Sequence, residues 1–318
     1  MKIIGTGSAV PKKVVTNDML ADFLDTTDEW ITSRTGIHNR HLLTEENLLD
    51  LAIEAAKNAI ASSGVAPKDI DLIICSNVAN NYITPSMSTM VEGEIGCECP
   101  CVDMNVACAG FIYALDYAEA YFVARGARNI LVLCAEEPTR FLNWKQRENS
   151  VLFGDGAGAV VLTRGNDMLA SRLRAVSNKE VIIYRKRMEP TPYEVEGVNI
   201  DAPLYMNGRE VFRMAVKSSQ QDLQYVLEHA GVDPLNIEYY LLHQANQRII
   251  DAIQEGMRLP KKKFPSIIHE YGNTSSASIP ILMDIMHRNG ELHNGDLLAL
   301  SAFGAGFVSA AAIIRWSK

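Results

Sequence analysis

Apolar residues recur at helical spacing between residues 48 and 63, and the pattern stops at Gly64. The spacing predicts an amphipathic helix with a glycine just beyond its last turn. A second helix is predicted from about 109 to 125. The segments Ile70–Cys75 and Asn129–Ala135 are short and almost continuously apolar. Such runs are typical of strands buried on both faces of a sheet, so the alternation predicts an α/β protein.

The chain also repeats itself. Gly64–Pro67 and Gly231–Pro234 have nearly the same sequence and lie 167 residues apart. The same shift places Leu131–Ala135 on Leu298–Ala302, and both regions are followed by a glycine turn and an apolar strand. A single shift that serves distant segments indicates duplication. We therefore predict two similar α/β halves, 1–165 and 166–318.

Composition and charge narrow the class of protein. Hydrophobic residues make up 47% and charged residues 21% of the 318 positions, which excludes a disordered or fibrous chain. The net charge of −8 argues against a nucleic-acid-binding protein. No apolar run is long enough to span a membrane, and the start of the chain lacks the apolar core of a signal peptide. We expect a cytoplasmic protein with reduced cysteines. Residues 178–205, which include Arg185–Arg187, are the least patterned stretch.

Reactive side chains fall where predicted strands or loops meet helices. Cys108 lies in a small-residue turn that opens the 109–125 helix, and the 167-residue shift places Ser275 opposite it. His243 follows a predicted strand, and Asn273 precedes a helix predicted over 276–288. In α/β sheets these junctions form the ligand crevice.

These residue types suit acyl transfer. A thiol at a helix N-terminus has a lowered pKa, and the thiolate attacks an acyl thioester. His and Asn side chains can each donate a hydrogen bond to an oxygen that gains negative charge. Taken singly, each residue is more often structural: a buried cysteine, a satisfied histidine, an asparagine cap. Together they favour acyl transfer followed by formation of an enolate.

The chain resembles the β-ketoacyl-acyl-carrier-protein synthase III family of the thiolase superfamily, over essentially its whole length. The resemblance rests on blocks in a fixed order: Asp25–Ile31 with Arg34–Ile37, Ala107–Phe111, Phe153–Ala159, His243–Asn246, Gly272–Ser275 and Phe303–Phe307. It implies a thiolase-like five-layered α-β-α-β-α fold of two pseudo-symmetric halves, a homodimer, and no cofactor.

The resemblance also implies roles for single residues. Cys108 would take an acyl group from acyl-CoA, and His243 with Asn273 would hold the thioester oxygen of a malonyl donor while carbon dioxide leaves. The oxyanion site and gate would comprise the backbone of Cys108 and the turn Phe303, Gly304, Ala305 and Gly306. The CoA contacts would be Trp30, Arg34, Arg147, Gly208 and Asn246.

Two further features concern CoA and the carrier protein. Thr26 and Glu29 have the spacing of a capping box, which predicts a helix that carries Trp30. An indole can stack on adenine, and a guanidinium can pair with phosphate. Arg213 and Arg248, with Lys261–Lys263, are basic side chains that would meet an acidic acyl carrier protein, although a charge run is often only a solvated face.

Two further features concern the acyl pocket and a run of cysteines. Thr84 stands where the family commonly has Phe, in a segment that by resemblance reaches across the dimer to the partner's acyl pocket. Its smaller side chain predicts primers longer or bulkier than acetyl. Cys97, Cys99 and Cys101 invite a metal interpretation, but the ligand spacing of zinc sites is absent, so we expect ordinary thiols and no metal.

We therefore expect a decarboxylating Claisen condensing enzyme. It would join an acyl-CoA primer to a malonyl thioester, carried by acyl carrier protein, and so initiate fatty acid synthesis. Three alternatives stay open: a relative in specialised metabolism that uses another primer, a plain acyltransferase, and a catalytically silent acyl-binding protein.

Overall fold

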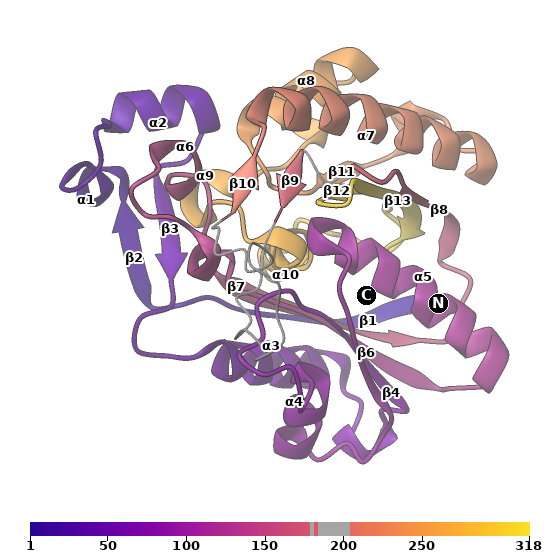
Figure 1. The fold of residues 1–318 in the computed structure, drawn as a ribbon. Helices are drawn as coiled ribbons and strands as arrows, with labels where there is room; N and C mark the ends of the chain where they lie inside the picture. The colour runs from indigo at the N-terminus through magenta and orange to yellow at the C-terminus, as the bar shows by residue number, and fades with distance from the viewer. Residues whose placement is uncertain (179–180, 184–203) are drawn as a thin grey trace, which may run out of the picture.

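The computed structural model describes residues 1–178, 181–183 and 204–318. Arg185–Arg187, singled out in the sequence, lies outside the described residues. Figure 1 shows two larger sheets with helices between them and on their outer sides. The architecture is the α/β fold predicted from the alternating pattern.

The first sheet has the order β1-β7-β6-β4-β5. β4, β5 and β6 are parallel to one another, and β7 runs antiparallel to both β1 and β6. Nearly every residue of β6 and β7 is buried, as expected for strands covered on both faces. The strands are β1 (Lys2–Ala9), β4 (Leu72–Ser76), β5 (Cys101–Met104), β6 (Asn129–Glu136) and β7 (Gly156–Thr163).

The second sheet repeats the first without its edge strand. Its order is β11-β12-β13-β8, with β11 and β12 parallel and the other pairs antiparallel. β8, β13, β12 and β11 thus correspond to β1, β7, β6 and β4, and β5 has no counterpart among the described strands. The bounds are β8 (Met168–Ala175), β11 (Tyr239–Leu242), β12 (Leu297–Gly304) and β13 (Val308–Arg315).

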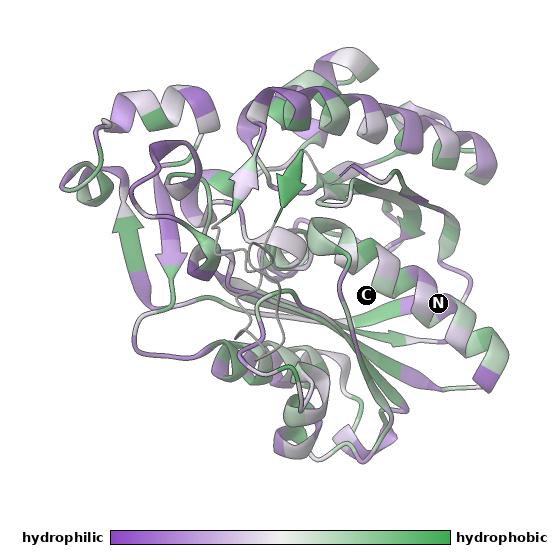
Figure 2. Ribbon diagram, in the orientation of Figure 1, coloured by the Kyte–Doolittle hydropathy of each residue, from purple (hydrophilic) through white to green (hydrophobic). Residues whose placement is uncertain are grey.

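Helices complete five layers. α3 and α4 cover the outer face of the first sheet, α5 and α10 lie between the sheets, and α7 and α8 cover the second sheet. In Figure 2 the strands of the first sheet are largely hydrophobic, whereas α7 is mostly hydrophilic on its visible side. The bounds are α3 (Leu48–Ser63), α4 (Met87–Ile95), α5 (Gly110–Arg125), α7 (Gly208–Ala230), α8 (Gln247–Met257) and α10 (Ser278–Arg288).

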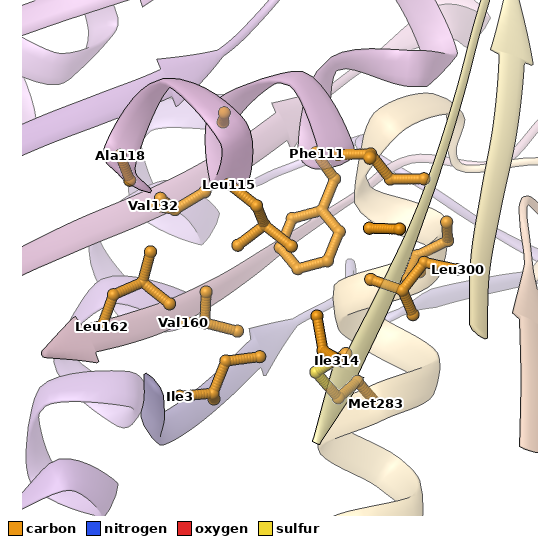
Figure 3. Close-up of a cluster of buried hydrophobic side chains, with 14 of the residues drawn as sticks. Ile3, Phe111, Leu115, Ala118, Val132, Val160, Leu162, Met283, Leu300 and Ile314 are labelled. Carbon is orange, nitrogen blue, oxygen red and sulfur yellow. The ribbon is translucent and has the colours of Figure 1, made fainter. Parts of the chain in front are cut away.

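The central layer forms one shared core. Phe111 of α5 and Met283 of α10 are fully buried and lie among Val160 of the first sheet and Leu300 and Ile314 of the second (Figure 3). Each buried side chain of this size contributes about 1.5–3 kcal/mol. Both halves supply this core. The division into 1–165 and 166–318 therefore stays a prediction about the repeat in the sequence, not about units that fold separately.

The repeat shift is not constant. Leu72 and Tyr239 begin equivalent strands 167 residues apart. Ala107 and Ser275 begin the equivalent 3-10 turns η2 (Ala107–Ala109) and η6 (Ser275–Ala277) and are 168 apart; both have positive φ, 45° and 53°. The structural counterpart of Cys108 is therefore Ser276, and the sequence assignment of Ser275 was wrong by one residue. An extra residue in the second-half connection causes this difference.

Smaller elements surround the layers. β2 and β3 form an antiparallel pair, and α1 and α2 lie beside them. β9 and β10 form a second short pair. The bounds are α1 (Asn17–Ala21), α2 (Asp28–Thr35), α6 (Arg147–Ser150), α9 (Ile268–Tyr271), β2 (Lys13–Thr16), β3 (Asn39–Leu42), β9 (Ile182–Ile183) and β10 (Tyr205–Met206). The remaining 3-10 turns are η1 (Pro67–Asp69), η3 (Pro138–Phe141), η4 (Pro234–Asn236) and η5 (Lys261–Lys263).

Candidate active site

One pocket collects most of the predicted site residues. It contains roughly 1020 Å³ of free space. Ten of the predicted residues line it: Trp30, Arg34, Cys108, Gly208, His243, Asn246, Asn273, Phe303, Gly304 and Ala305. Much of the remaining wall is apolar, with Leu152, Val211, Phe212 and Ile249 among its residues. An apolar pocket with a few converging polar groups is typical of a ligand site.

Cys108 lies in η2, two residues before α5 begins, and its side chain is half-buried. The Ser275 hydroxyl donates a hydrogen bond to the Cys108 sulfur over 3.4 Å. Burial raises the pKa of Cys108 to about 12, and the nearby Glu136 carboxylate adds to the rise, whereas the Ser275 bond opposes it. The expectation of a lowered thiol pKa was therefore wrong. The loss of hydration in the enclosed site outweighs the helix terminus, so acylation requires a proton acceptor.

His243 follows β11 and is almost fully buried. Burial lowers the pKa of His243 to about 3, so the imidazole is neutral near pH 7. Its Nδ1 lies 2.8 Å from the Ser278 Oγ, which also accepts a hydrogen bond from the Gln244 backbone N–H over 3.3 Å. We assign the Ser278 proton to the bond with Nδ1, which makes Nδ1 the acceptor and places the ring proton on Nε2.

A hydrogen bond to its side-chain oxygen holds Asn273 in place. Its Oδ1 accepts a hydrogen bond from the Ser275 backbone N–H over 2.9 Å. Its backbone N–H donates to the Leu152 carbonyl, and its carbonyl accepts from the Gly154 N–H, at 2.9 and 3.1 Å. These bonds fix the loop before η6 and leave the Nδ2 amide as the donor end of the side chain. Neutral His243 and Asn273 thus supply two donors within one pocket.

Phe303 and Gly304 end β12 next to these groups. The Phe303 ring makes an edge contact with His243, with 5.3 Å between ring centroids. A methyl group on Gly304 would lie 2.7 Å from the Cys108 backbone nitrogen and 3.0 Å from the Ala107 Cβ. The absence of a side chain at Gly304 therefore leaves the strand end directly against the nucleophile turn.

Trp30 lies on α2 in contact with two guanidinium groups. The Cζ atoms of Arg34 and Arg147 lie 4.6 and 4.3 Å from its ring centroid. Arg147 also donates a hydrogen bond to the Asp25 carbonyl over 2.6 Å. Asn246 caps α8 and donates to the Arg34 carbonyl over 3.1 Å, which joins this cluster to the second half of the chain.

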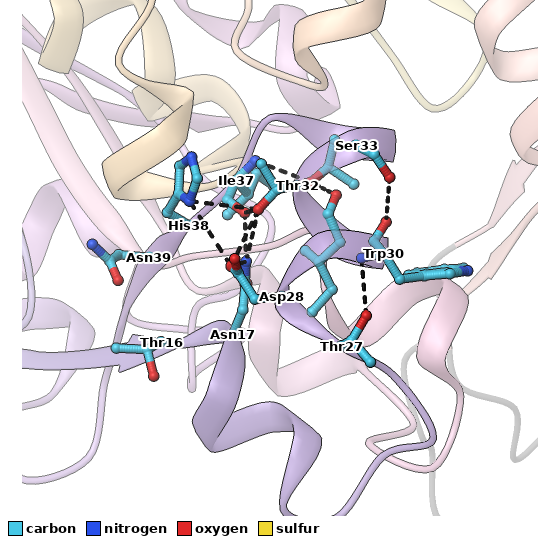
Figure 4. A network of polar contacts seen from close by, with 12 residues as sticks. Thr16, Asn17, Thr27, Asp28, Trp30, Thr32, Ser33, Ile37, His38 and Asn39 are labelled. Atoms are coloured by element: carbon cyan, nitrogen blue, oxygen red, sulfur yellow. Dashed lines mark hydrogen bonds and ion pairs between the residues drawn. The ribbon is translucent and has the colours of Figure 1, made fainter.

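A polar network fixes the helix that carries Trp30 (Figure 4). The Asn17 amide donates to Asp28 Oδ1 and to the Ile37 carbonyl, each over 2.7 Å. Thr27 is the N-cap, because its hydroxyl accepts from the Trp30 N–H over 3.1 Å. The predicted capping box of Thr26 with Glu29 is therefore wrong: the helix begins one residue later, and Trp30 at the third helical position cannot complete a capping box.

The other predicted residues do not line this pocket. Arg213 forms an ion pair with Glu210 at 2.8 Å, and Arg248 is exposed on α8. Gly306 follows the strand end but is not among the residues that line the pocket. Thr84 is exposed in the segment before α4. Arg147 contacts Trp30 without lining the pocket itself.

Lys261–Lys263 and the cysteine run lie outside this pocket. Lys261 pairs with Asp251 at 3.4 Å, and Lys263 donates to the Ile237 carbonyl. Within the described residues, no three His, Cys, Asp or Glu side chains are grouped so as to hold a metal ion. None of the described helices is long and apolar enough to cross a membrane.

Sequence reasoning missed three polar residues that support the site. Ser278 contacts His243, and Ser275, predicted only as the repeat counterpart of Cys108, contacts the Cys108 sulfur. Glu136 is fully buried at the end of β6, where it accepts a hydrogen bond from Ser276 over 2.6 Å. A charged residue directly after the apolar run 129–135 was the available signal for Glu136.

The chain is similar to known proteins over almost its whole length. A family model described as 3-Oxoacyl-[acyl-carrier-protein (ACP)] synthase III matches residues 102–177, and the corresponding C-terminal model matches residues 227–316. The beta-ketoacyl-[acyl-carrier-protein] synthase III of Rhizorhabdus wittichii is 41% identical over 320 residues, 99% of this chain and 98% of that protein.

Two solved structures give the same result. The 3-oxoacyl-[acyl-carrier-protein] synthase III from Aquifex aeolicus is 39% identical, with a TM-score of 0.91 and 99% of each chain covered. The synthase III from Thermus thermophilus is 34% identical, with a TM-score of 0.93, covering 100% of this chain and 99% of that one. The five-layered thiolase-like fold predicted from the sequence is confirmed.

Proposed function

Because the chain belongs to the 3-oxoacyl-acyl-carrier-protein synthase III family, we propose that it is the condensing enzyme that initiates fatty acid synthesis. It joins an acyl-CoA primer to a malonyl group on acyl carrier protein and forms a 3-oxoacyl thioester. The observation that carries this proposal is the convergence of Cys108, His243 and Asn273 in one largely apolar pocket.

The first half-reaction acylates Cys108. The thiol loses its proton, and the sulfur attacks the acyl carbonyl of acyl-CoA. A tetrahedral intermediate forms and expels the CoA thiolate. In this proposal the backbone N–H of Cys108, next to the end of β12 at Gly304, stabilises the oxyanion.

The second half-reaction consumes the malonyl donor. His243 and Asn273 donate hydrogen bonds to its thioester oxygen, which becomes an enolate oxygen as carbon dioxide leaves. The enolate carbon attacks the acyl-Cys108 carbonyl, and the Cys108 thiolate departs. A neutral imidazole suits this role, because burial keeps the pKa of His243 at about 3. Phe303, packed on His243, provides an apolar wall that disfavours the charged carboxylate and favours its loss.

The Trp30 cluster is the proposed binding site for the nucleotide end of CoA. Adenine stacking on the indole replaces one of the two guanidinium groups that now cover it. The displaced Arg34 or Arg147 is then free to pair with a phosphate. Gly208 and Asn246 line the pocket beyond Trp30 and contact the CoA arm in this proposal.

An acyl carrier protein and a second copy of the chain are the proposed partners. Arg213 of α7 and Arg248 of α8 are exposed cations and are the proposed contacts for an acidic carrier protein. β5 is an edge strand, and Ile83 and Tyr82 beside Thr84 are 81% and 56% exposed, as an interface with a second copy requires. We propose a cytoplasmic homodimer in which Thr84 reaches the partner's acyl pocket.

Mass spectrometry of the intact protein tests the function. Wild-type protein incubated with a panel of acyl-CoAs should gain the mass of one acyl group on Cys108. Malonyl-acyl carrier protein added next should release carbon dioxide and yield a 3-oxoacyl product. Acylation without carbon dioxide release would indicate a plain acyltransferase instead, and no acylation with any primer would reject the proposal.

A further inference from the structure

A buried carboxylate lies behind the nucleophile. Glu136 ends β6, and its Oε1 accepts a hydrogen bond from the Ser276 hydroxyl over 2.6 Å. Its Oε2 accepts one from the Val78 backbone N–H over 3.3 Å. The neighbouring Ser275 hydroxyl lowers the pKa of this carboxyl, although burial raises it more. A carboxylate that is 1% exposed is rare unless it is paired or has a function.

Ser275 lies between this carboxylate and the reacting sulfur. Its Oγ is 3.4 Å from the Cys108 sulfur. Glu136 and Ser275 also line one small cavity together with Ala107, next to Cys108. The Ser275 proton is directed at the sulfur in the structure; when the hydroxyl rotates this proton toward Glu136, its oxygen can accept the proton of Cys108. The Ser275 hydroxyl thus contacts the sulfur and shares a cavity with the carboxylate, which places it between the two groups.

We propose that Glu136 accepts, through the Ser275 hydroxyl, the proton that Cys108 loses when it is acylated. The inference rests on the proposed function, which requires Cys108 to lose this proton. Glu136 does not touch the substrate; it acts through Ser275 and positions the proton.

The proton can be followed through one cycle. The S–H bond of Cys108 breaks as its sulfur forms a bond to the acyl carbon, Ser275 receives the proton, and the original Ser275 proton passes to Glu136. The acyl–sulfur bond of CoA breaks, and the CoA thiolate takes a proton from water after it leaves. When the enolate later attacks acyl-Cys108, the Cys108 thiolate departs and recovers the proton from Glu136 by the reverse path.

The acidities of the two groups agree with this direction. Burial raises the pKa of Glu136 to about 8 and that of Cys108 to about 12, so the carboxyl is the stronger acid of the pair. The other titratable groups that face Glu136 are the thiols of Cys75 and Cys134, whose pKa values burial also raises. Among the described residues, no cationic side chain lowers the pKa of Glu136. Because the carboxylate form prevails only above about pH 8, acylation should become faster as the pH rises through that value.

The test measures acylation of Cys108 against pH in wild type, Glu136→Gln, Ser275→Ala and the double variant. Each single variant should acylate about 10²-fold more slowly at pH 8, at the lower end of general-base effects, and should lose the rise near that pH. The double variant should be no slower than the slower single variant, since both changes interrupt one path. Ser309→Ala is the matched control, because it breaks a buried bond to Asp222 of 2.6 Å away from the pocket and should acylate normally.

A different role for Glu136 predicts the opposite change in rate. If Glu136 acts only as a nearby negative charge, Glu136→Gln should lower the pKa of Cys108 and speed its reaction, and this outcome would overturn the proposal. Alkylation of Cys108 by iodoacetamide is measured in the same variants, because it needs no acyl-CoA. If wild type is not acylated, the proposed function fails, while the alkylation profiles still test the path. If Glu136→Gln does not fold, Ser275→Ala decides by itself.

Discussion

The Nδ1 atom of His243 lies 2.8 Å from the Oγ of Ser278, the first residue of α10. The Gln244 N–H donates to the same oxygen, so the Ser278 proton is available to the imidazole. With the Ser278 proton assigned to the bond with Nδ1, Nε2 is the nitrogen that carries the ring proton. Ser278, at the start of α10, therefore directly contacts the histidine that follows β11 and that we propose as an enolate donor.

Ser278→Ala should weaken malonyl decarboxylation. The loss of one hydrogen bond costs about 1 kcal/mol, which corresponds to roughly a fivefold slower step. Acylation of Cys108 should change less, because this step does not use the enolate donors. The measurement is carbon dioxide release from malonyl-acyl carrier protein alongside acyl transfer. An equal decrease in both steps would show a general structural defect instead.

Replacement of either enolate donor should have a larger effect. His243→Ala and Asn273→Ala each remove a donor that strengthens in the transition state, and such a loss costs about 2.7–4 kcal/mol, or 10²–10³ in kcat. Because burial keeps the pKa of His243 at about 3, the imidazole stays neutral and decarboxylation should show no His243 titration between pH 5 and 8. A decrease of wild-type decarboxylation below pH 6.5 that His243→Ala abolishes would contradict the neutral-donor role.

Cys108→Ser should abolish condensation while acyl-CoA binding survives. A serine hydroxyl is a poorer nucleophile than this thiol, and an oxygen ester is a poorer acyl donor than a thioester. Acyl transfer is followed by the mass of the intact protein, and binding by calorimetry with acyl-CoA. Turnover near the wild-type level in Cys108→Ser would mean that another residue is the nucleophile.

Gly304→Ala should impair acylation without unfolding the protein. The added methyl group would lie 2.7 Å from the Cys108 nitrogen, a distance that side-chain motion cannot relieve because the contact is with backbone. The nucleophile turn must shift, and a loss on the order of 10²-fold in acylation is expected, as for removal of one oxyanion donor. The control is Gly93→Ala in α4, where nothing lies within 4 Å of the new methyl group. Unchanged acylation in Gly304→Ala would separate Gly304 from the oxyanion site.

The sequence predicted the layers well because each rests on local pattern. The apolar runs around Ile73 and Leu131 did become strands buried on both faces. The predicted 167-residue shift between the halves is wrong by one residue at Ser275. An inserted residue in a connecting loop does not change the hydrophobic pattern, so the sequence does not reveal it. The direction of the Cys108 pKa was also wrong, because the helix that follows is visible in the sequence while the enclosing walls come from distant segments. Glu136 acquires its neighbours only when β6 packs against the turn at Ser275, so no short motif could indicate its surroundings.

The acyl pocket gives the last prediction. Thr84 is exposed in this chain, beside Ile83, whose side chain is 81% exposed, so its proposed contact is with the pocket of a second copy. Thr is smaller than Phe, and each additional buried methylene of a primer contributes about 0.8 kcal/mol. Wild type should therefore accept primers longer or bulkier than acetyl, and Thr84→Phe should shift the preference toward short chains by about 1–3 kcal/mol.

Primer competition in wild type and Thr84→Phe tests this, with acylated Cys108 as the readout. Size-exclusion chromatography with light scattering is needed beside it, because the prediction requires a dimer. The competing explanation is that Met90, which is half-buried in α4, fills the space whatever stands at position 84. Met90→Ala would then widen the preference, whereas Thr84→Phe would change nothing. An acetyl-only wild type with an unchanged Thr84→Phe variant would refute the assignment of Thr84, and a monomer would refute the contact by which it acts.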